Sequence, residues 1–412
     1  MKKLTFVFLG ILFFTVSCKK EDVNSSSLSK FEISNASSLI ISSSSEKSGE
    51  GNKLFKITDE GYLEEVTYTD KEGNKITVVN TPLDIFNINT EYLIVEFGSQ
   101  ENHPESAYIV RKSDGAAFTL DNCGYPLKSY NYFKNFNPVQ VDNNLNIYYL
   151  AHYEYISRKI VKVELNPSDN LTSVDVSPTN EHIEVFAPDS DGNIIYYGRK
   201  LDEIDGTISN FRIKMTNGGV YNLPYNTMNF WRANDGNLYY SHPNHWDSIF
   251  KISIDENFEV NERFYGEIKN LDFQKFQSDI INLSDKTYII GVKGIYEVYN
   301  TNNKPTKVEG LNLSTIKAST SSNDFIYLSG NNLSNSPVLL KLDPRTNTAT
   351  ELLAPGEYDI YSMSASANNI ISISALRMND GKKILGEIGE NGVLKIVDEE
   401  SNMEVIVLKR IN

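Results

Sequence analysis

The stretch DSDGNIIYYG, residues 189 to 198, returns in altered form as ANDGNLYYSH at residues 233 to 242. Each copy is a polar turn of Asp, Gly and Asn that leads into a short apolar run. Turns of this composition between apolar runs predict β-hairpins. The two copies therefore predict that one strand-turn-strand unit recurs along the chain.

Eight apolar tetrads of this kind can be aligned. Their spacing runs from 38 to 55 residues and averages about 47, which is near the length of one propeller blade. A second strand follows each tetrad, a third follows after a polar turn, and another apolar segment precedes most tetrads. Each unit thus has four short strands, A to D, with the tetrad in strand B. The tetrads are LIIS at 39, YLIV at 92, IYYL at 147, IIYY at 194, LYYS at 238, TYII at 287, FIYL at 325 and IISI at 370.

These units predict an all-β fold, a β-propeller of four-stranded blades. A solitary four-stranded sheet would leave both faces in water, whereas radial stacking buries them and leaves only short edges. The stretch LLKLDPRTNTATEL, residues 339 to 352, resembles the generic propeller repeat, and the resemblance extends over residues 31 to 412. We expect eight blades, with seven blades and a decorated N-terminal segment as the alternative.

Ring closure is expected to use the end of the sequence. After the eighth D strand comes one more apolar stretch, MEVIVLKRI from Met403 to Ile411, which we interpret as a closing strand that pairs with the first blade. In the first unit, strand A is expected at KFEIS, from Lys30 to Ser34, after a serine-rich segment.

The N-terminal segment predicts an export signal. MKK precedes an uncharged apolar run of 13 residues, Leu4 to Val16, which is too short to span a bilayer as a helix. TVSC at its end resembles the lipobox of bacterial lipoproteins, and the resemblance implies that Cys18 carries the lipid. An ordinary cleaved signal is the alternative. We therefore expect a signal peptide at 1–17, a serine-rich tether at 18–30 and the propeller at 31–412.

The residues after Cys18 suggest where in the cell the protein is located. KKED, Lys19 to Asp22, resembles the tract that follows the cysteine in surface-exposed lipoproteins of flavobacteria and their relatives (Bacteroidota). This implies a protein that is lipid-anchored in the outer membrane and exposed at the cell surface. The alternative is a solvated tether.

Charge and cysteine content restrict the partners. The formal charge is −15, and it becomes −17 when Lys2 and Lys3 are removed with the signal. Such an acidic surface repels phosphate backbones, so nucleic acid is not expected as a partner. With Cys18 acylated, Cys123 stands alone and no internal disulfide can form.

A propeller presents two rims. The A–B and C–D turns form one, here called the turn rim, and the B–C and D–A connections form the other, the loop rim. The longer loops fall on the loop rim, where function in loop-bearing scaffolds concentrates. All five histidines are expected there: His103, His152, His182, His242 and His245.

The candidate ligand-binding residues lie in the loop rim of the third to fifth blades. Aromatic and basic side chains in loops suit sugars or peptides, and we expect them to form one continuous patch. HPNH supplies two imidazoles, but its spacing fixes no third ligand, so neither a metal site nor a cofactor is predicted. DSI, around Ser248, matches a short O-glycosylation motif, and its use is left open. The predicted site residues are His152, Tyr155, Arg199, His242, His245 and Trp246.

Two classes of function fit this sequence. The first is a non-catalytic, lipid-anchored binding module whose loop rim takes a glycan, peptide or protein partner. The alternative is a propeller enzyme, a glycosidase or polysaccharide lyase, with its site in the central funnel. A quinone-dependent dehydrogenase is disfavoured, because that class carries tryptophan in each repeat and this chain has only Trp231 and Trp246. No G-x-S-x-G nucleophile elbow is present either.

Overall fold

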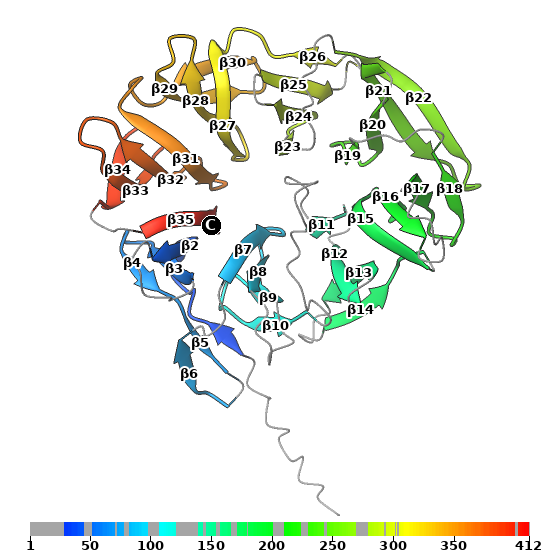
Figure 1. Cartoon of the computed structure of the whole chain (residues 1–412), viewed down its shortest axis with the longest axis horizontal. Helices are drawn as coiled ribbons and strands as arrows, with labels where there is room; N and C mark the ends of the chain where they lie inside the picture. The colour runs from blue at the N-terminus through cyan, green and yellow to red at the C-terminus, as the bar shows by residue number, and fades with distance from the viewer. Residues whose placement is uncertain are drawn as a thin grey trace, which may run out of the picture.

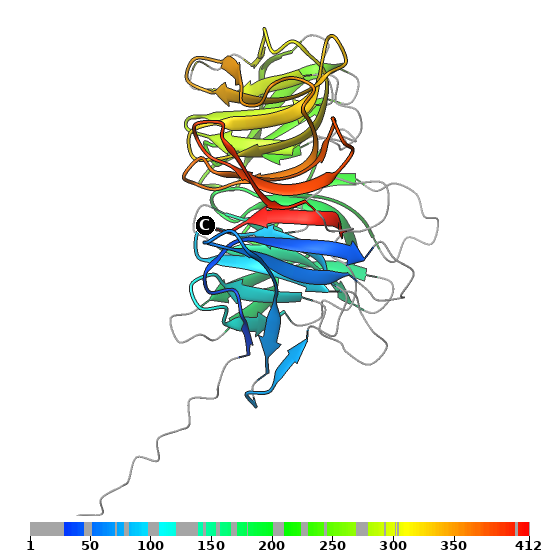
Figure 2. The ribbon, with the colours of Figure 1, turned by 90° about the vertical axis from the view of Figure 1, so that its left-hand side faces the viewer.

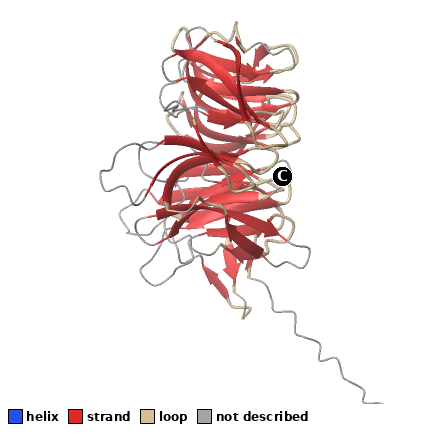
Figure 3. Ribbon diagram, turned by 90° about the vertical axis from the view of Figure 1, so that its right-hand side faces the viewer, coloured by secondary structure: helices blue, strands red, loops and turns tan. Residues whose placement is uncertain are grey.

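The computed structural model describes residues 29–44, 52–70, 72–77, 82–97, 107–120, 139–142, 146–153, 157–165, 171–178, 180–200, 210–223, 230–242, 245–268, 279–291, 294–300, 302, 305–399 and 403–411. These residues form strands and turns (Figure 3). They include no helix long and apolar enough to cross a membrane.

Eight four-stranded antiparallel sheets stand in a ring as the blades of a β-propeller (Figure 1), and we call the region around the central axis of this ring the channel. The prediction of eight blades is confirmed, and the seven-bladed alternative is wrong. From the channel outward, the strands of the first four blades are: in blade 1, β35 (Met403–Arg410), β2 (Ala36–Ser44), β3 (Lys53–Thr58) and β4 (Leu63–Glu65); in blade 2, β7 (Pro82–Asn87), β8 (Tyr92–Phe97), β9 (Ala107–Arg111) and β10 (Ala117–Thr119); in blade 3, β11 (Val139–Val141), β12 (Ile147–Tyr153), β13 (Ser157–Leu165) and β14 (Leu171–Asp175); in blade 4, β15 (Glu181–Pro188), β16 (Ile194–Lys200), β17 (Asn210–Lys214) and β18 (Val220–Asn222).

The other four blades repeat this order. They are: in blade 5, β19 (Phe230–Arg232), β20 (Leu238–His242), β21 (His245–Ile254) and β22 (Val260–Glu267); in blade 6, β23 (Asp279–Leu283), β24 (Lys286–Gly291), β25 (Gly294–Tyr299) and β26 (Thr306–Lys307); in blade 7, β27 (Leu313–Ser321), β28 (Ile326–Asn332), β29 (Pro337–Asp343) and β30 (Thr348–Glu351); in blade 8, β31 (Tyr358–Ala365), β32 (Ile371–Arg377), β33 (Lys383–Ile388) and β34 (Leu394–Asp398). Each of the eight tetrads supplies the second strand of a blade, as predicted.

The ring closes through the end of the sequence. Strand β35 pairs antiparallel with β2, with Leu408 opposite Ile40, so it supplies strand A of the first blade (Figure 2). The predicted closing strand is confirmed.

The expectation that strand A of blade 1 lies at Lys30 to Ser34 is wrong. Lys30 and Phe31 form β1, which joins β5 (Thr67–Thr69) and β6 (Lys75–Thr77) in a separate three-stranded sheet. The reason is packing: the Phe31 ring lies 5.0 Å from Tyr68 and 5.9 Å from Phe97, centroid to centroid. Residues before β2 therefore fasten blade 1 to blade 2 at the outside of the ring.

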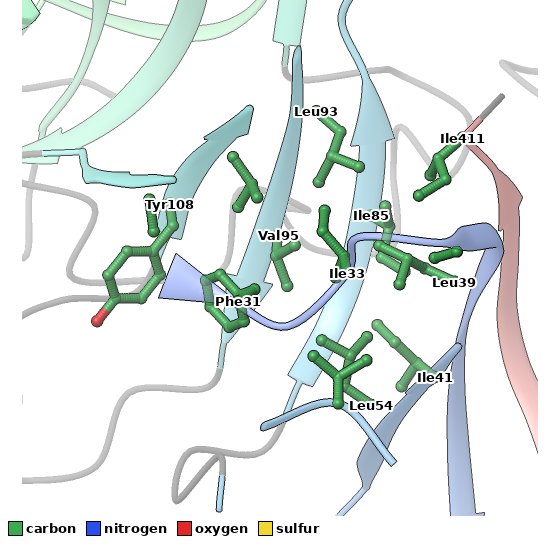
Figure 4. Packing of buried hydrophobic residues seen from close by; sticks show 14 of the residues in the cluster. Phe31, Ile33, Leu39, Ile41, Leu54, Ile85, Leu93, Val95, Tyr108 and Ile411 are labelled. Carbon is green, nitrogen blue, oxygen red and sulfur yellow. The ribbon is translucent and has the colours of Figure 1, made fainter. Parts of the chain in front are cut away.

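The core is divided into eight apolar clusters, one between each pair of neighbouring blades. Successive side chains of a strand point to opposite faces, so each strand B feeds two clusters. In blade 3, Tyr149 packs toward blade 2 and Tyr148 toward blade 4. Figure 4 shows the cluster between blades 1 and 2, where Leu39 and Ile41 meet Ile85 and Leu93.

One hairpin turn recurs along the chain. The amide of its first residue donates to the carbonyl of the fifth, and the amide of the fourth donates back to the first, as between Asp189, Gly192 and Asn193. The fourth residue has a positive φ, 84° at Gly192, which glycine adopts without steric cost. The same pair of bonds begins at Thr58, Asp70, Met215, Ala233, Asp255, Asn332, Ser366 and Gly389.

Candidate binding site at the channel mouth

The structure places the predicted site residues at the loop-rim ends of blades 3 to 5. His152 lies near the end of β12, Arg199 near the end of β16, and His242 is the last residue of β20. His245 and Trp246 open β21. Tyr155 and Cys18 lie outside the described residues, so the continuous patch expected for this set stays a prediction.

Part of the predicted loop of blade 5 is strand. HPNHWDS was expected to be a loop, but His242 pairs with His245, and Trp246 to Ser248 continue β21. The pairing of β20 with β21 continues beyond the last apolar residue of β20. A hydrophobic pattern in the sequence cannot predict this part of β20, because its residues are polar. Ser248 is 7% exposed and pairs with Glu267, so it lies within the β21–β22 ladder and not in an exposed loop.

The innermost strands carry a feature that the sequence analysis missed. In five blades, strand A contains a residue with no partner on strand B, which is a β-bulge, and blade 7 has a second one at Ser314. A bulge leaves the extra residue out of the ladder and redirects its side chain. One bulged residue in each of these blades is compared below: Ile406 in blade 1, Leu83 in blade 2, Glu184 in blade 4, Lys317 in blade 7 and Tyr361 in blade 8.

All five bulges lie at the same level of the ring. In blade 4, the Asn193 carbonyl accepts the hydrogen bond that closes the A–B turn. The bulge of strand A lies opposite the gap between Tyr197 and Gly198, which are the fourth and fifth residues of strand B after Asn193. The count is the same in blades 1, 2, 7 and 8. In blades 3, 5 and 6 the described part of strand A ends before this level. We call the five bulged residues the girdle.

The girdle exposes side chains to the central channel. Neighbouring blades cover both faces of strand A and strand B covers its outer edge, so an exposed side chain there reaches water through the channel. Ile406 is 46% exposed and Tyr361 41% exposed, and they belong to adjacent blades. Ile280, on strand A of blade 6, is 44% exposed. Large apolar side chains are thus left in contact with water on the innermost strands of blades 1, 6 and 8.

Two ion pairs involve residues of the innermost strands. Lys317 Nζ lies 2.6 Å from Asp359 Oδ1, which joins strand A of blade 7 to strand A of blade 8 beside Tyr361. Within blade 4, Arg212 Nη1 lies 2.5 Å from Glu181 Oε2, and both side chains are at most 7% exposed. Burial, and then the Glu181 carboxylate, raise the pKa of the Tyr196 hydroxyl above its usual value, which keeps that phenol neutral. These contacts fix the start of β15, where half-buried His182 pairs with Arg199.

The sequence does contain a trace of the girdle. In a regular strand buried residues recur at every second position, but in β31 the step from Ile360 to Met363 is three residues. Strand B opposite the bulge also carries small residues: Gly198, Gly330, Ala375 and Ser42, with Phe97 as the exception. Gly330 is needed there, because an added Cβ would lie 2.0 Å from the Thr315 carbonyl oxygen.

Comparison with known proteins adds structural likenesses. No family model matches the chain, and no curated protein matches it in sequence. A crystal structure described as the eukaryotic initiation factor is similar with a TM-score of 0.45 at 13% identity over 89% of this chain and 97% of that one. A putative 6-phosphogluconolactonase from Bacteroides fragilis gives 0.42 at 10% identity over 79% of this chain and 99% of that one. Virginiamycin B lyase from Staphylococcus aureus gives 0.35 at 12% identity over 63% of this chain and 82% of that one.

Proposed function

We propose that this protein is a lipid-anchored, non-catalytic β-propeller that binds a glycan, peptide or protein partner at the loop-rim mouth of its channel. The observation that carries the proposal is the girdle. It presents an aromatic ring, Tyr361, and an aliphatic side chain, Ile406, to water at one level, next to the ion pair of Lys317 and Asp359. Aromatic and aliphatic groups supply most of the contact area in binding sites, and a few polar groups set orientation.

The position of the girdle supports a ligand that enters from the loop rim. The bulges lie four to five residues beyond the A–B turns, and therefore in the half of each strand A nearer the loop rim. The ends of β12, β16 and β20, which carry the predicted site residues, lie at that same rim. A ligand held by loop-rim residues could therefore reach Tyr361.

The proposed lipid anchor and the proposed location at the outer membrane rest on the sequence. TVSC places a cysteine directly after the apolar export segment, and KKED follows it. Acyl chains contribute about 0.8 kcal/mol per buried CH₂ to membrane binding, so a multiply acylated Cys18 would hold the propeller at the outer membrane.

The proposal is tested by screening the purified protein on glycan and peptide arrays beside two tyrosine variants. Tyr361→Ala should weaken binding of the selected ligand at least tenfold, because it removes an exposed ring from the channel wall. The matched control is Tyr62→Ala, since Tyr62 is 68% exposed in the C–D turn of blade 1, on the turn rim. Equal losses in both variants, or none in either, would reject the channel as the site.

The catalytic alternative would depend on Glu184, the one carboxylate among the five girdle residues. A glycosidase or lyase acting in the funnel needs an acid that faces the channel. A binding module should return the array-selected ligand unchanged after long incubation. Cleavage that is abolished in Glu184→Gln would instead establish the enzyme.

A further inference from the structure

A separate cavity lies on the turn rim, at the seam where the ring closes. Its volume is about 710 Å³. Strands β35 and β2 come from opposite ends of the sequence, so no short hairpin turn joins them as in other blades, and the turns of the neighbouring blades border the cavity. It is lined by Asn87–Glu91 and Arg111–Ser113 of blade 2, Ala365 and Ala367 of blade 8, and Arg410 and Ile411 at the end of β35.

The bonds around the cavity hold its walls in place. Asn87 Nδ2 donates to the Arg410 carbonyl at 2.8 Å, which ties blade 2 to the closing strand. The Lys112 amide donates to the Glu91 carbonyl at 2.8 Å, which ties the two turns of blade 2 together. The cavity is therefore bounded by structure that belongs to the closed ring.

Two of the three cations around the cavity are already paired. Arg111 donates to Asp114 through two nitrogens, at 2.9 and 2.8 Å. Arg410 Nη1 lies 2.5 Å from Glu387 Oε1. Lys112 is in no ion pair with the residues that the structure describes, although it is partly buried in a chain of formal charge −15.

The electrostatics of Lys112 agree with this geometry. Burial alone lowers the pKa of its amine to about 8, and no carboxylate of the described residues offsets the effect. An ammonium held without a counterion in a cavity gains most from an anion that enters it. Beside it, Ile88, Ile411, Ala365 and Ala367 offer an apolar wall.

We propose that this cavity binds a small organic carboxylate with an apolar body, whose carboxylate pairs with the Lys112 ammonium and whose body packs on Ile88 and Ile411. Asn89, Thr90 and Ser113 add hydrogen-bonding groups around the charged end. This site lies on the opposite rim from the girdle and is independent of the function proposed there.

The chain contains a control for removing the lysine. Arg111 to Gly115 and Arg377 to Gly381 are the same turn, R-x-x-D-G, in which the arginine donates to the aspartate and the glycine amide donates to the arginine carbonyl. The second turn carries Met378 at the position of Lys112, and Met378 is 47% exposed. Lys112→Met therefore installs a side chain that this turn already accepts.

Stability should confirm that the variant is folded. The amine has a lower pKa in the folded state than its usual 10.5, so the folded protein bears the cost of the buried charge at pH 7 and loses that cost as pH rises through 8 to 10.5. Lys112→Met should melt at the same temperature as the parent or higher at pH 7. The difference should disappear above pH 10.5.

The binding test uses hexanoate as the probe. Calorimetry should detect binding of hexanoate and not of hexanol, and NMR of ¹³C-methylated lysines should show that hexanoate raises the pKa of Lys112 by a unit or more. Lys112→Met should weaken hexanoate binding at least tenfold, and Lys382→Met, which removes an exposed lysine, should leave it unchanged. Equal binding of hexanol, or full hexanoate binding by Lys112→Met, would overturn the proposal.

Discussion

At the scale of residues, one turn chemistry recurs in different surroundings. Asp189 Oδ1 accepts from the amides of Asp191 and Asn193, and its Oδ2 accepts from the Asn193 side chain. Asp70 and Asn74 make the equivalent backbone and side-chain bonds in an exposed turn. Burial raises the pKa of Asp189, whereas the hydrogen bonds of Asn74 lower that of Asp70. The two pKa directions show that the Asp189 carboxylate bears a desolvation cost, which its hydrogen bonds offset only in part, whereas the Asp70 carboxylate is favoured by its bonds.

The first prediction compares these two carboxylates. Asp189→Ala should lower the free energy of unfolding by about 1–3 kcal/mol, because it leaves buried donors without an acceptor. Asp70→Ala should cause a clearly smaller loss, since water can bond the freed amides. Urea unfolding of both variants measures the difference. Equal losses would mean that burial does not set the value of the turn.

At the scale of elements, the girdle depends on close approach between strands A and B. Gly330→Ala should force the bulge of blade 7 to shift, because the added Cβ would lie 2.0 Å from the Thr315 carbonyl oxygen. We expect a loss of about 1–3 kcal/mol in the free energy of unfolding. The control is Ala375→Gly, at the same position in blade 8, which should cost only about 0.5–1 kcal/mol. A Gly330→Ala variant as stable as the parent would show that the bulge of blade 7 does not require glycine at position 330.

The closing strand supplies another matched pair. Leu408 is 3% exposed in the cluster between blades 8 and 1, and Ile406 of the same strand is 46% exposed. Leu408→Asp should unfold the seam, at a cost of more than about 3 kcal/mol for an unpaired buried charge. Ile406→Asp should leave the melting temperature nearly unchanged. Thermal unfolding of the two variants checks the assignment, which fails if they melt alike.

These elements show what the sequence could predict. Strand B can be predicted because the apolar tetrads are buried on both faces and most of them follow short polar turns, so eight blades can be counted. The closing strand was visible as a surplus strand in MEVIVLKRI. The place of Lys30 and Phe31 was not, because it depends on contacts with Tyr68 and Phe97 far along the chain. The girdle was missed for a similar reason: an irregular pairing changes one step in the apolar alternation, and only the paired strand reveals it.

At the scale of the whole molecule, the ring depends on its seam. Deleting residues 402 to 412 removes strand A of blade 1 and exposes the faces of blades 1 and 8. The variant should melt at a sharply lower temperature or become insoluble. Circular dichroism against temperature gives the measurement. A parent-like melting curve would show that β35 is dispensable.

The anchor is a separate property of the whole chain. Cys18→Ala should move the protein from the membrane fraction to the soluble fraction of cells, because no acyl chain could then be attached. Neutral residues in place of Lys19 to Asp22 should leave it anchored but inaccessible to external protease. Unchanged protease access in this second variant would refute surface export, and unchanged fractionation of the first would refute the lipid anchor.

The central claim is that a partner binds in the channel at the girdle, and hydrogen–deuterium exchange with the array-selected ligand tests it most directly. A bulge leaves backbone groups outside the ladder, so amides near Tyr361 and Ile406 should exchange fast in the free protein. Bound ligand should slow exchange in segments 358–363 and 404–408 and leave the turn at 58–62 unchanged. Protection confined to the turn rim or to the outer strands of the blades would contradict the claim.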